Sequence, residues 1–169
     1  MSIFGVVIDV PEPHARVLTA ARESFGDPEA LHVPPHVTVV GPVSIDPEAM
    51  PSVEDHIQEA VRRCAPFRMH LRGTGTFRPV TPTVFVAVAE GIPGCEELER
   101  RIRCGPLGVD LRYPYHPHVT VAFDLPAESL DRAFEELAGF DAVFTVDTVR
   151  LVELDDGRWQ MRRSYALTG

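Results

Sequence analysis

The sequence predicts an α+β protein made of two similar halves. The five-residue word PHVTV occurs twice, at residues 35–39 and 117–121, which is unusual in a chain of 169 residues. In each half a hydrophobic strand, the PHVTV strand and a helix follow in the same order. No glycine-rich phosphate loop of the G-x-G-x-x-G or G-x-x-x-x-G-K type occurs. The pattern therefore favours halves related by pseudo-twofold symmetry over a doubly wound parallel sheet.

The first half is expected to hold two strands and two helices. The β-branched runs IFGVVIDV at residues 3–10 and PHVTVVGPV at residues 35–43 are typical of buried strands. Between them, apolar residues recur at helical spacing over residues 11–25. The sequence DPE at residues 46–48 is a helix start, with a capping Asp, a Pro in the first turn and an acid near the positive end of the helix dipole. Apolar spacing extends this second helix to about residue 64.

The rest of the chain continues the alternation of strands and helices. Strands are expected at residues 67–78, 83–89, 118–125, 142–154 and 158–168. Helices are expected around residues 98–102 and over residues 126–138. Glycines at 73 and 75 should bend the first of these strands. Ile92-Pro93-Gly94 should interrupt the chain before the third helix. The turn DDG at residues 155–157 predicts a hairpin between the last two strands. The inward face of the last helix should consist of Leu130, Ala133, Phe134 and Leu137.

Length and composition suit a globular protein that occupies residues 1–169 as one domain with two lobes. The chain is 44% hydrophobic and 24% charged, and its formal net charge is −9. This acidity weighs against binding to long nucleic acid, but a small nucleotide or one RNA end in a local basic cleft remains compatible with it. We expect a cytoplasmic protein, because there is no apolar run of membrane-spanning length, no signal peptide and no C-x-x-C pair. The three cysteines are expected to be reduced, with Cys95 and Cys104 as a weak candidate pair on one helix.

The two PHVTV strands carry the candidate chemistry. Residues two apart on a strand share a face, so His36 and Thr38 project together, as do His118 and Thr120. The valines between them then point into the core. A pseudo-twofold axis would bring the two His/Thr pairs to opposite sides of one cleft.

Two imidazoles that flank a phosphodiester can divide the proton transfers of an in-line displacement. A neutral His accepts a proton from the attacking water, and a protonated His donates one to the leaving oxygen. Threonine hydroxyls can donate hydrogen bonds to the non-bridging oxygens. The sequence leaves open which His is the base. A metal site built from His36, His116 and His118 is the alternative, but no Asp, Glu or Cys stands at ligand spacing and the threonines would have no role.

The paired H-x-T motifs resemble those of the two-histidine (2H) phosphoesterase superfamily, which includes the RNA 2′,3′-cyclic phosphodiesterases or 2′-5′ RNA ligase-like proteins. VPPHVTVVGPV, PYHPHVTVAF and the GTGTFRPV…VFVAV stretch carry the resemblance, which covers nearly the whole chain. It implies a bilobal fold of antiparallel sheets with helices packed outside and an open central cleft. It also implies catalysis by His36 and His118, phosphate binding by Thr38 and Thr120, and opening of a 2′,3′-cyclic phosphate to a 2′-phosphate without metal or cofactor.

Further residues are candidates for substrate binding. Tyr113, Tyr115 and Phe77 could stack on a base. Arg72, Arg78 and Arg150 could clamp a second phosphate. Trp159, just after the hairpin, is expected in the core or against a partner.

The expected ligand is a cyclic phosphate nucleotide or an RNA 3′ end, bound by a monomer that interacts with neither membrane nor long DNA. Many RNA-end members of the family place a basic residue after the second motif, whereas Ala122-Phe123-Asp124 follow here, which favours a small substrate. Two other functions stay open: a nucleotide- or RNA-end-binding module without turnover, and 2′-5′ RNA ligation by the reverse reaction.

Overall fold

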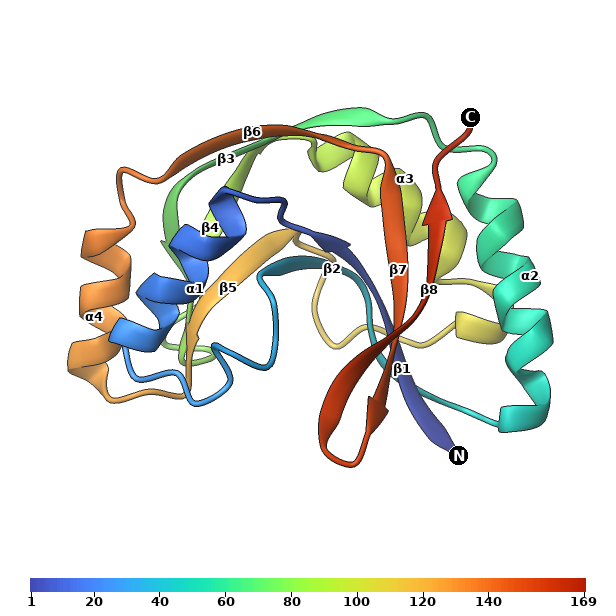
Figure 1. The fold of residues 1–169 in the computed structure, drawn as a ribbon, viewed down its shortest axis with the longest axis horizontal. Coiled ribbons are helices and arrows are strands. Elements are labelled where there is room, and N and C mark those ends of the chain that lie inside the picture. Colours follow the sequence, from blue (N-terminus) through green and yellow to red (C-terminus); the bar gives the residue numbers. More distant parts are fainter.

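The computed structural model describes residues 1–169 as a single eight-stranded sheet covered by four helices (Figure 1). The strand order is β6-β3-β4-β5-β2-β1-β7-β8, and every neighbouring pair is antiparallel. The strands are β1 (Ser2–Asp9), β2 (His36–Ile45), β3 (Phe67–Thr76), β4 (Thr83–Glu90), β5 (His118–Phe123), β6 (Asp141–Val146), β7 (Thr148–Asp155) and β8 (Arg158–Ala166). The helices are α1 (His14–Ser24), α2 (Met50–Val61), α3 (Ile92–Ile102) and α4 (Ala127–Glu136), with short 3-10 turns at Pro47–Ala49 and Gly105–Leu107. The predicted α+β class is confirmed.

The sheet consists of two four-stranded halves that meet at β2 and β5. One half, β2-β1-β7-β8, carries His36 and is called the His36 half; the other, β5-β4-β3-β6, carries His118 and is called the His118 half. Their junction is the pair Val37↔Val119. Each PHVTV strand is therefore the innermost strand of its half.

The helices are exchanged between the halves. The helix that connects β1 to β2, α1, contacts β5 and lies beside α4 on the His118 half, whereas α3, which connects β4 to β5, contacts β2 and α2 on the His36 half (Figure 1). Both exchanges bury the valine face of the PHVTV strands. Val37 and Val119 are fully buried, and they belong to one hydrophobic cluster of 38 residues.

The expected strand over residues 142–154 is wrong, because it is two strands that separate at Asp147. The first, β6, pairs with β3 at the edge of the His118 half, and the second, β7, pairs with β1 in the His36 half. The sequence AVFTVDTVRLVEL keeps strand-like composition through the break, so periodicity cannot show that the chain changes halves there.

The third helix also begins earlier than expected. Ile92-Pro93-Gly94 does not interrupt the chain but forms the first turn of α3. Proline is tolerated there because the first N–H groups of a helix have no partner within the helix. In α4, Phe134 does not point inward as expected, since it is 39% exposed.

The cysteines do not pair. Cys95 is buried in α3, whereas Cys104 lies beyond the end of that helix and is exposed, so the candidate Cys95–Cys104 pair is wrong. All three cysteines are free thiols. None of the four helices combines the length and the apolar character needed to cross a membrane.

Candidate active site

The two His/Thr pairs lie on one face of the sheet at the junction of its halves. Val37 and Val119 are partners in an antiparallel ladder, so the neighbouring residues along this register place His36 across from Thr120 and Thr38 across from His118. The side chains of these four residues point away from the buried valine face. The histidines thus occupy one diagonal of a four-residue cluster and the threonines the other, with diagonal Cα atoms about 7–8 Å apart. We call this cluster the His/Thr quartet.

Both imidazole rings are held by the same local hydrogen bond. Nδ1 of His36 lies 2.8 Å from the carbonyl oxygen of Pro34, and Nδ1 of His118 lies 2.6 Å from that of His116. A carbonyl oxygen only accepts, so each Nδ1 carries the proton that it donates. In the neutral ring Nε2 is then the unprotonated nitrogen and is available for proton transfer.

The environment favours the neutral form of both rings. Burial lowers the pKa of His36 and of His118 from 6.5, against the opposing effect of the carbonyl hydrogen bonds. Arg22 lowers the pKa of His36 further, whereas Asp9 raises it. The positive charges of His116 and His36, when present, lower the pKa of His118. Simultaneous protonation of both histidines is therefore disfavoured in the free protein.

Aromatic rings pack around His118. The ring of Phe77 meets it edge-on at 5.0 Å between centroids, and Phe85 lies at 5.2 Å. Phe85 occupies this place because its cross-strand partner is Gly75, where a Cβ atom would lie 2.5 Å from the Phe85 ring. His116 also packs against Phe77, at 5.4 Å.

Next to His118 is a cavity of about 580 Å³ that we call the His118 hollow. Thr38, His118 and the predicted residues Phe77, Tyr113 and Tyr115 line it, as does Arg103, which the sequence did not single out. The exposed ring of Tyr113 is available for stacking, while Tyr115 is mostly buried.

Tyr115 connects the two motifs. Its hydroxyl donates a hydrogen bond of 2.9 Å to the backbone carbonyl of Thr38, and burial raises the pKa of that hydroxyl. The segment that leads into His118 is thereby joined to the strand that carries His36. This places Tyr115 as a support of the His/Thr quartet rather than as a freely exposed stacking surface.

A second, smaller cavity of about 250 Å³, the His36 hollow, lies on the other side of the quartet. It is lined by His36, Thr38, Arg150 and Trp159, among others. Trp159 is therefore not in the core, one of the two places that the sequence suggested, but lies beside the candidate site. Trp159 and Met161 are two residues apart on β8 and therefore share a face, and this spacing is the signal that could have placed them together.

The three predicted arginines have different positions. Arg150 lines the His36 hollow, where it forms an ion pair with Asp9. Arg78 instead pairs with Asp131 on α4 at 2.8 Å, and Arg72 is exposed on β3 opposite Asp141. Neither Arg72 nor Arg78 lines either hollow. No three His, Cys, Asp or Glu side chains of the chain are grouped as a metal site requires.

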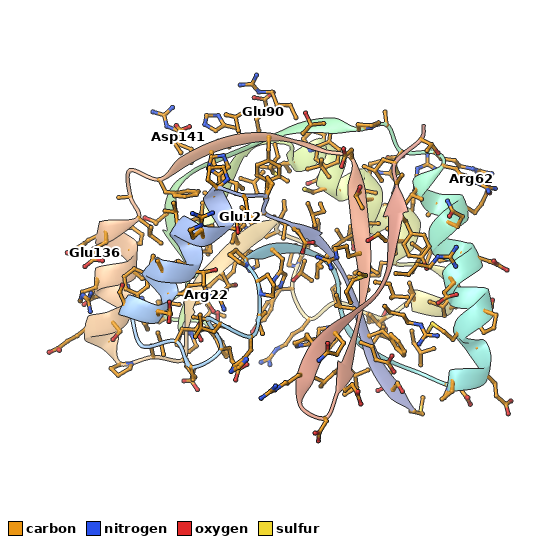
Figure 2. All side chains as sticks on the ribbon, in the orientation of Figure 1. Glu12, Arg22, Arg62, Glu90, Glu136 and Asp141 are labelled. Carbon is orange, nitrogen blue, oxygen red and sulfur yellow. The ribbon has the colours of Figure 1, made fainter.

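A buried arginine fixes the segment that precedes His36. Arg22 forms an ion pair of 2.9 Å with Asp27 and donates a hydrogen bond of 2.5 Å to the carbonyl of Val33. Figure 2 shows its side chain between α1 and the loop that runs on to β2. The next residue, Pro34, provides the carbonyl that holds the His36 ring.

Comparison with known proteins decides the family. The model of the 2′-5′ RNA ligase superfamily matches residues 10–158, a range that includes the whole His/Thr quartet. This chain belongs to the 2′-5′ RNA ligase superfamily. The resemblance found in the sequence is thereby confirmed.

Superfamily relatives have similar length and similar folds. A candidate phosphoesterase of Halalkalibacterium halodurans is 25% identical over 169 residues, covering 97% of this chain and 96% of its own. One of Oceanobacillus iheyensis is 26% identical over 167 residues, with 97% of both chains covered. The crystal structure of Escherichia coli LigT complexed with 3′-AMP superimposes with a TM-score of 0.66 at 20% identity, over 99% of both chains. A Thermus thermophilus structure, at 23% identity and 100% and 99% coverage of this and that chain, gives 0.62. The fold is LigT-like, and the protein is a candidate phosphoesterase of this superfamily.

Proposed function

We propose that this protein is a cyclic phosphodiesterase that opens a nucleoside 2′,3′-cyclic phosphate to the 2′-phosphate by acid–base catalysis. The main supporting observation is the pairing of Val37 with Val119, a register that brings two histidines and two threonines to one face of the sheet. Both histidines are oriented through Nδ1, so both Nε2 atoms are available to a phosphate bound between them. No metal or cofactor takes part in the proposed reaction.

The reaction needs two proton transfers at opposite sides of phosphorus. One neutral imidazole accepts a proton from water as the water oxygen forms its bond to phosphorus. The second imidazole, protonated, donates to the ribose 3′-oxygen as the bond between phosphorus and that oxygen breaks. The diagonal placement of His36 and His118 suits this division, because attacking and leaving oxygens stand in line across phosphorus.

Binding of the phosphate would prepare the acid. Burial keeps both imidazoles neutral in the free protein, and the negative charge of a bound phosphate favours protonation of one of them. Thr38 and Thr120 would donate hydrogen bonds to the non-bridging oxygens, where negative charge accumulates in the transition state.

The nucleoside that carries the cyclic phosphate would occupy the His118 hollow. Phe77 and Tyr113 offer aromatic surface there for stacking of the base, and Arg103, which forms an ion pair with Glu99, also lines the hollow. The neighbouring structures of LigT complexed with 3′-AMP and with NADP+ support a nucleotide as the ligand class.

The direct test is incubation with 2′,3′-cyclic AMP in excess EDTA, followed by phosphorus NMR. We expect 2′-AMP as the product, and no loss of rate with EDTA. A 3′-AMP product would retain the paired-histidine chemistry but reverse the leaving oxygen. Binding of 2′-AMP without turnover of the cyclic mononucleotide or of a cyclic-phosphate-ended RNA would refute the proposal in favour of a binding module.

A further inference from the structure

The His36 hollow is a depression in the face of the His36 half that carries His36 and Thr38. Its floor is apolar and consists of Gly5, Val7, Val40 and Val152, from three adjacent strands. Trp159 forms one wall, and a Cβ atom at Gly5 would lie 4.0 Å from its ring. Because residue 5 has no side chain, the floor beside the indole stays open.

The matching face of the His118 half is not open in the same way, because the His118 hollow is lined by β2 and by the segments before β4 and β5, not by the face of β3 and β4. Val7 lies across from Thr38 in β2, and the matching position across from Thr120 in β5 is Phe85. Arg150 lies across from Val7, whereas Gly75 lies across from Phe85. In the His118 half, therefore, a phenyl ring that belongs to the chain covers the sheet beside the quartet. In the His36 half the matching surface is free for a ring that belongs to a ligand.

The charged groups of the His36 hollow neutralise each other. Asp9, which lies across from His36, forms an ion pair with Arg150. The guanidinium charge is thus already compensated, which disfavours a second phosphate as the occupant. The pair still offers carboxylate oxygens as acceptors and the exposed part of the guanidinium as a donor, whereas Nε of Arg150 is buried without a hydrogen-bond partner. Adjacent donor and acceptor groups match the polar edge of a nucleobase.

We propose that the His36 hollow is a second nucleobase subsite, in which a base stacks on Trp159 and presents its polar edge to Asp9 and Arg150. At about 250 Å³ the hollow is smaller than the roughly 300–1,000 Å³ of a typical site for a whole small molecule, so it takes one ring system of a larger substrate. The two hollows share Thr38 and Gly41, and a ligand can therefore extend from one into the other.

This inference rests on the proposed function and narrows its substrate class. With the terminal nucleoside in the His118 hollow, the base of the preceding nucleoside reaches the His36 hollow. The preferred substrate is then an RNA end of at least two nucleotides, not the small mononucleotide that the residues after the second motif suggested.

A kinetic comparison separates the second base from the phosphate that links it. The value of kcat/KM is measured for adenylyl-adenosine 2′,3′-cyclic phosphate and for 5′-phosphoadenosine 2′,3′-cyclic phosphate, which carries the extra phosphate without the extra base. We expect the dinucleotide to be favoured by about 5- to 150-fold, the range that stacking of one base supplies. In Trp159→Leu this ratio should fall toward one, whereas in the control Phe134→Leu, on the outside of α4, it should persist. A wild-type ratio near one, or an unchanged ratio in Trp159→Leu, overturns the subsite.

A binding measurement tests the subsite without turnover. Trp159 is the single tryptophan of the chain, so its fluorescence reports directly on this hollow. The 2′-phosphorylated adenine dinucleotide should quench it saturably, while adenosine 2′,5′-bisphosphate and inorganic phosphate should not. Quenching without turnover of either cyclic phosphate would retain the subsite and refute the proposed reaction. Turnover without quenching would retain the proposed reaction and refute the subsite. Equal quenching by inorganic phosphate would identify an anion site instead of a base subsite.

Discussion

Val37 of β2 and Val119 of β5 form the one ladder pair that joins the two halves of the sheet. Both side chains are fully buried against the helices, so the residues on either side of them must face the opposite way. A single pair of core valines thereby determines the arrangement of all four candidate catalytic side chains. The predictions below test that arrangement and its supports.

Replacement of either candidate catalytic histidine should abolish most activity while the protein stays folded. His36→Gln and His118→Gln each remove one proton-transfer group, and we expect kcat to fall by about 10²- to 10⁴-fold. The measurement is initial-rate kinetics on a 2′,3′-cyclic phosphate, with circular dichroism as a folding control. His32→Gln is the matched control, because His32 is exposed and lines neither hollow. Near-normal activity in either single variant would contradict the mechanism.

The hydroxyls of the two threonines should matter more for kcat than for folding. Thr120→Val retains shape and removes a donor to the non-bridging oxygens, and we expect about a 100-fold loss of kcat. Thr120 is exposed, so the midpoint of urea unfolding should change little. Thr145→Val, at an exposed position of β6, provides the control. A loss seen only in KM would indicate ground-state binding instead.

Tyr115→Phe should lower the free energy of unfolding by about 1 kcal/mol. The change removes the hydrogen bond from the hydroxyl to the carbonyl of Thr38 and leaves that carbonyl without its partner. Tyr113→Phe, in the same segment but exposed, should change the free energy of unfolding much less. Urea titrations of both variants give the comparison, and equal effects would show that the Tyr115 hydrogen bond contributes nothing specific.

Arg22→Met should destabilise the protein and alter the titration of His36. Removal of the buried guanidinium leaves Asp27 without its ion-pair partner, at a cost of about 3 kcal/mol. It also removes a positive charge that lowers the pKa of His36, so the pH dependence of kcat/KM should shift to higher pH. Arg63→Met, which breaks an exposed pair with Glu59 near the end of α2, should do neither. An unshifted pH profile would show that Arg22 stabilises the protein without affecting the pKa of His36.

Stability should decrease on acidification from neutral pH. The pKa values of His36 and His118 are below 6.5 in the folded state, so below pH 6.5 the unfolded chain binds protons that the folded protein does not. The stabilisation is complete above pH 6.5 and is lost as the pH falls through the lowered values. Urea titrations at pH 7.5 and at about pH 5 should show the decrease. A double variant, His36→Gln with His118→Gln, should show a smaller one, and an identical decrease would rule out these two groups as its source.

The sequence predicted the quartet but only part of its surroundings, since Phe77, Tyr113, Tyr115 and Arg150 line the hollows whereas Arg103, Asp9 and Trp159 were not expected there. Alternation along a strand is local, so the shared face of His36 and Thr38 follows from two residues of spacing. Which strands become neighbours is not local, and Asp9, Arg150 and Trp159 come together from the two ends of the chain. The separation of β6 from β7 at Asp147 was missed for the same reason, since both strands are half-buried and have the same composition.

The exchange of α1 and α3 between the halves affects how this protein unfolds and whether its halves can fold as separate fragments. Strands β3 to β6 form a contiguous segment, residues 67–146, inserted between the two parts of the His36 half. Excision of that segment would leave β5 without α1 and would remove α3 from β2, so each fragment would expose the apolar face that the other normally covers. The two halves should therefore unfold together in one cooperative transition. Neither is expected to survive alone as a fragment, although each carries a complete His-x-Thr motif.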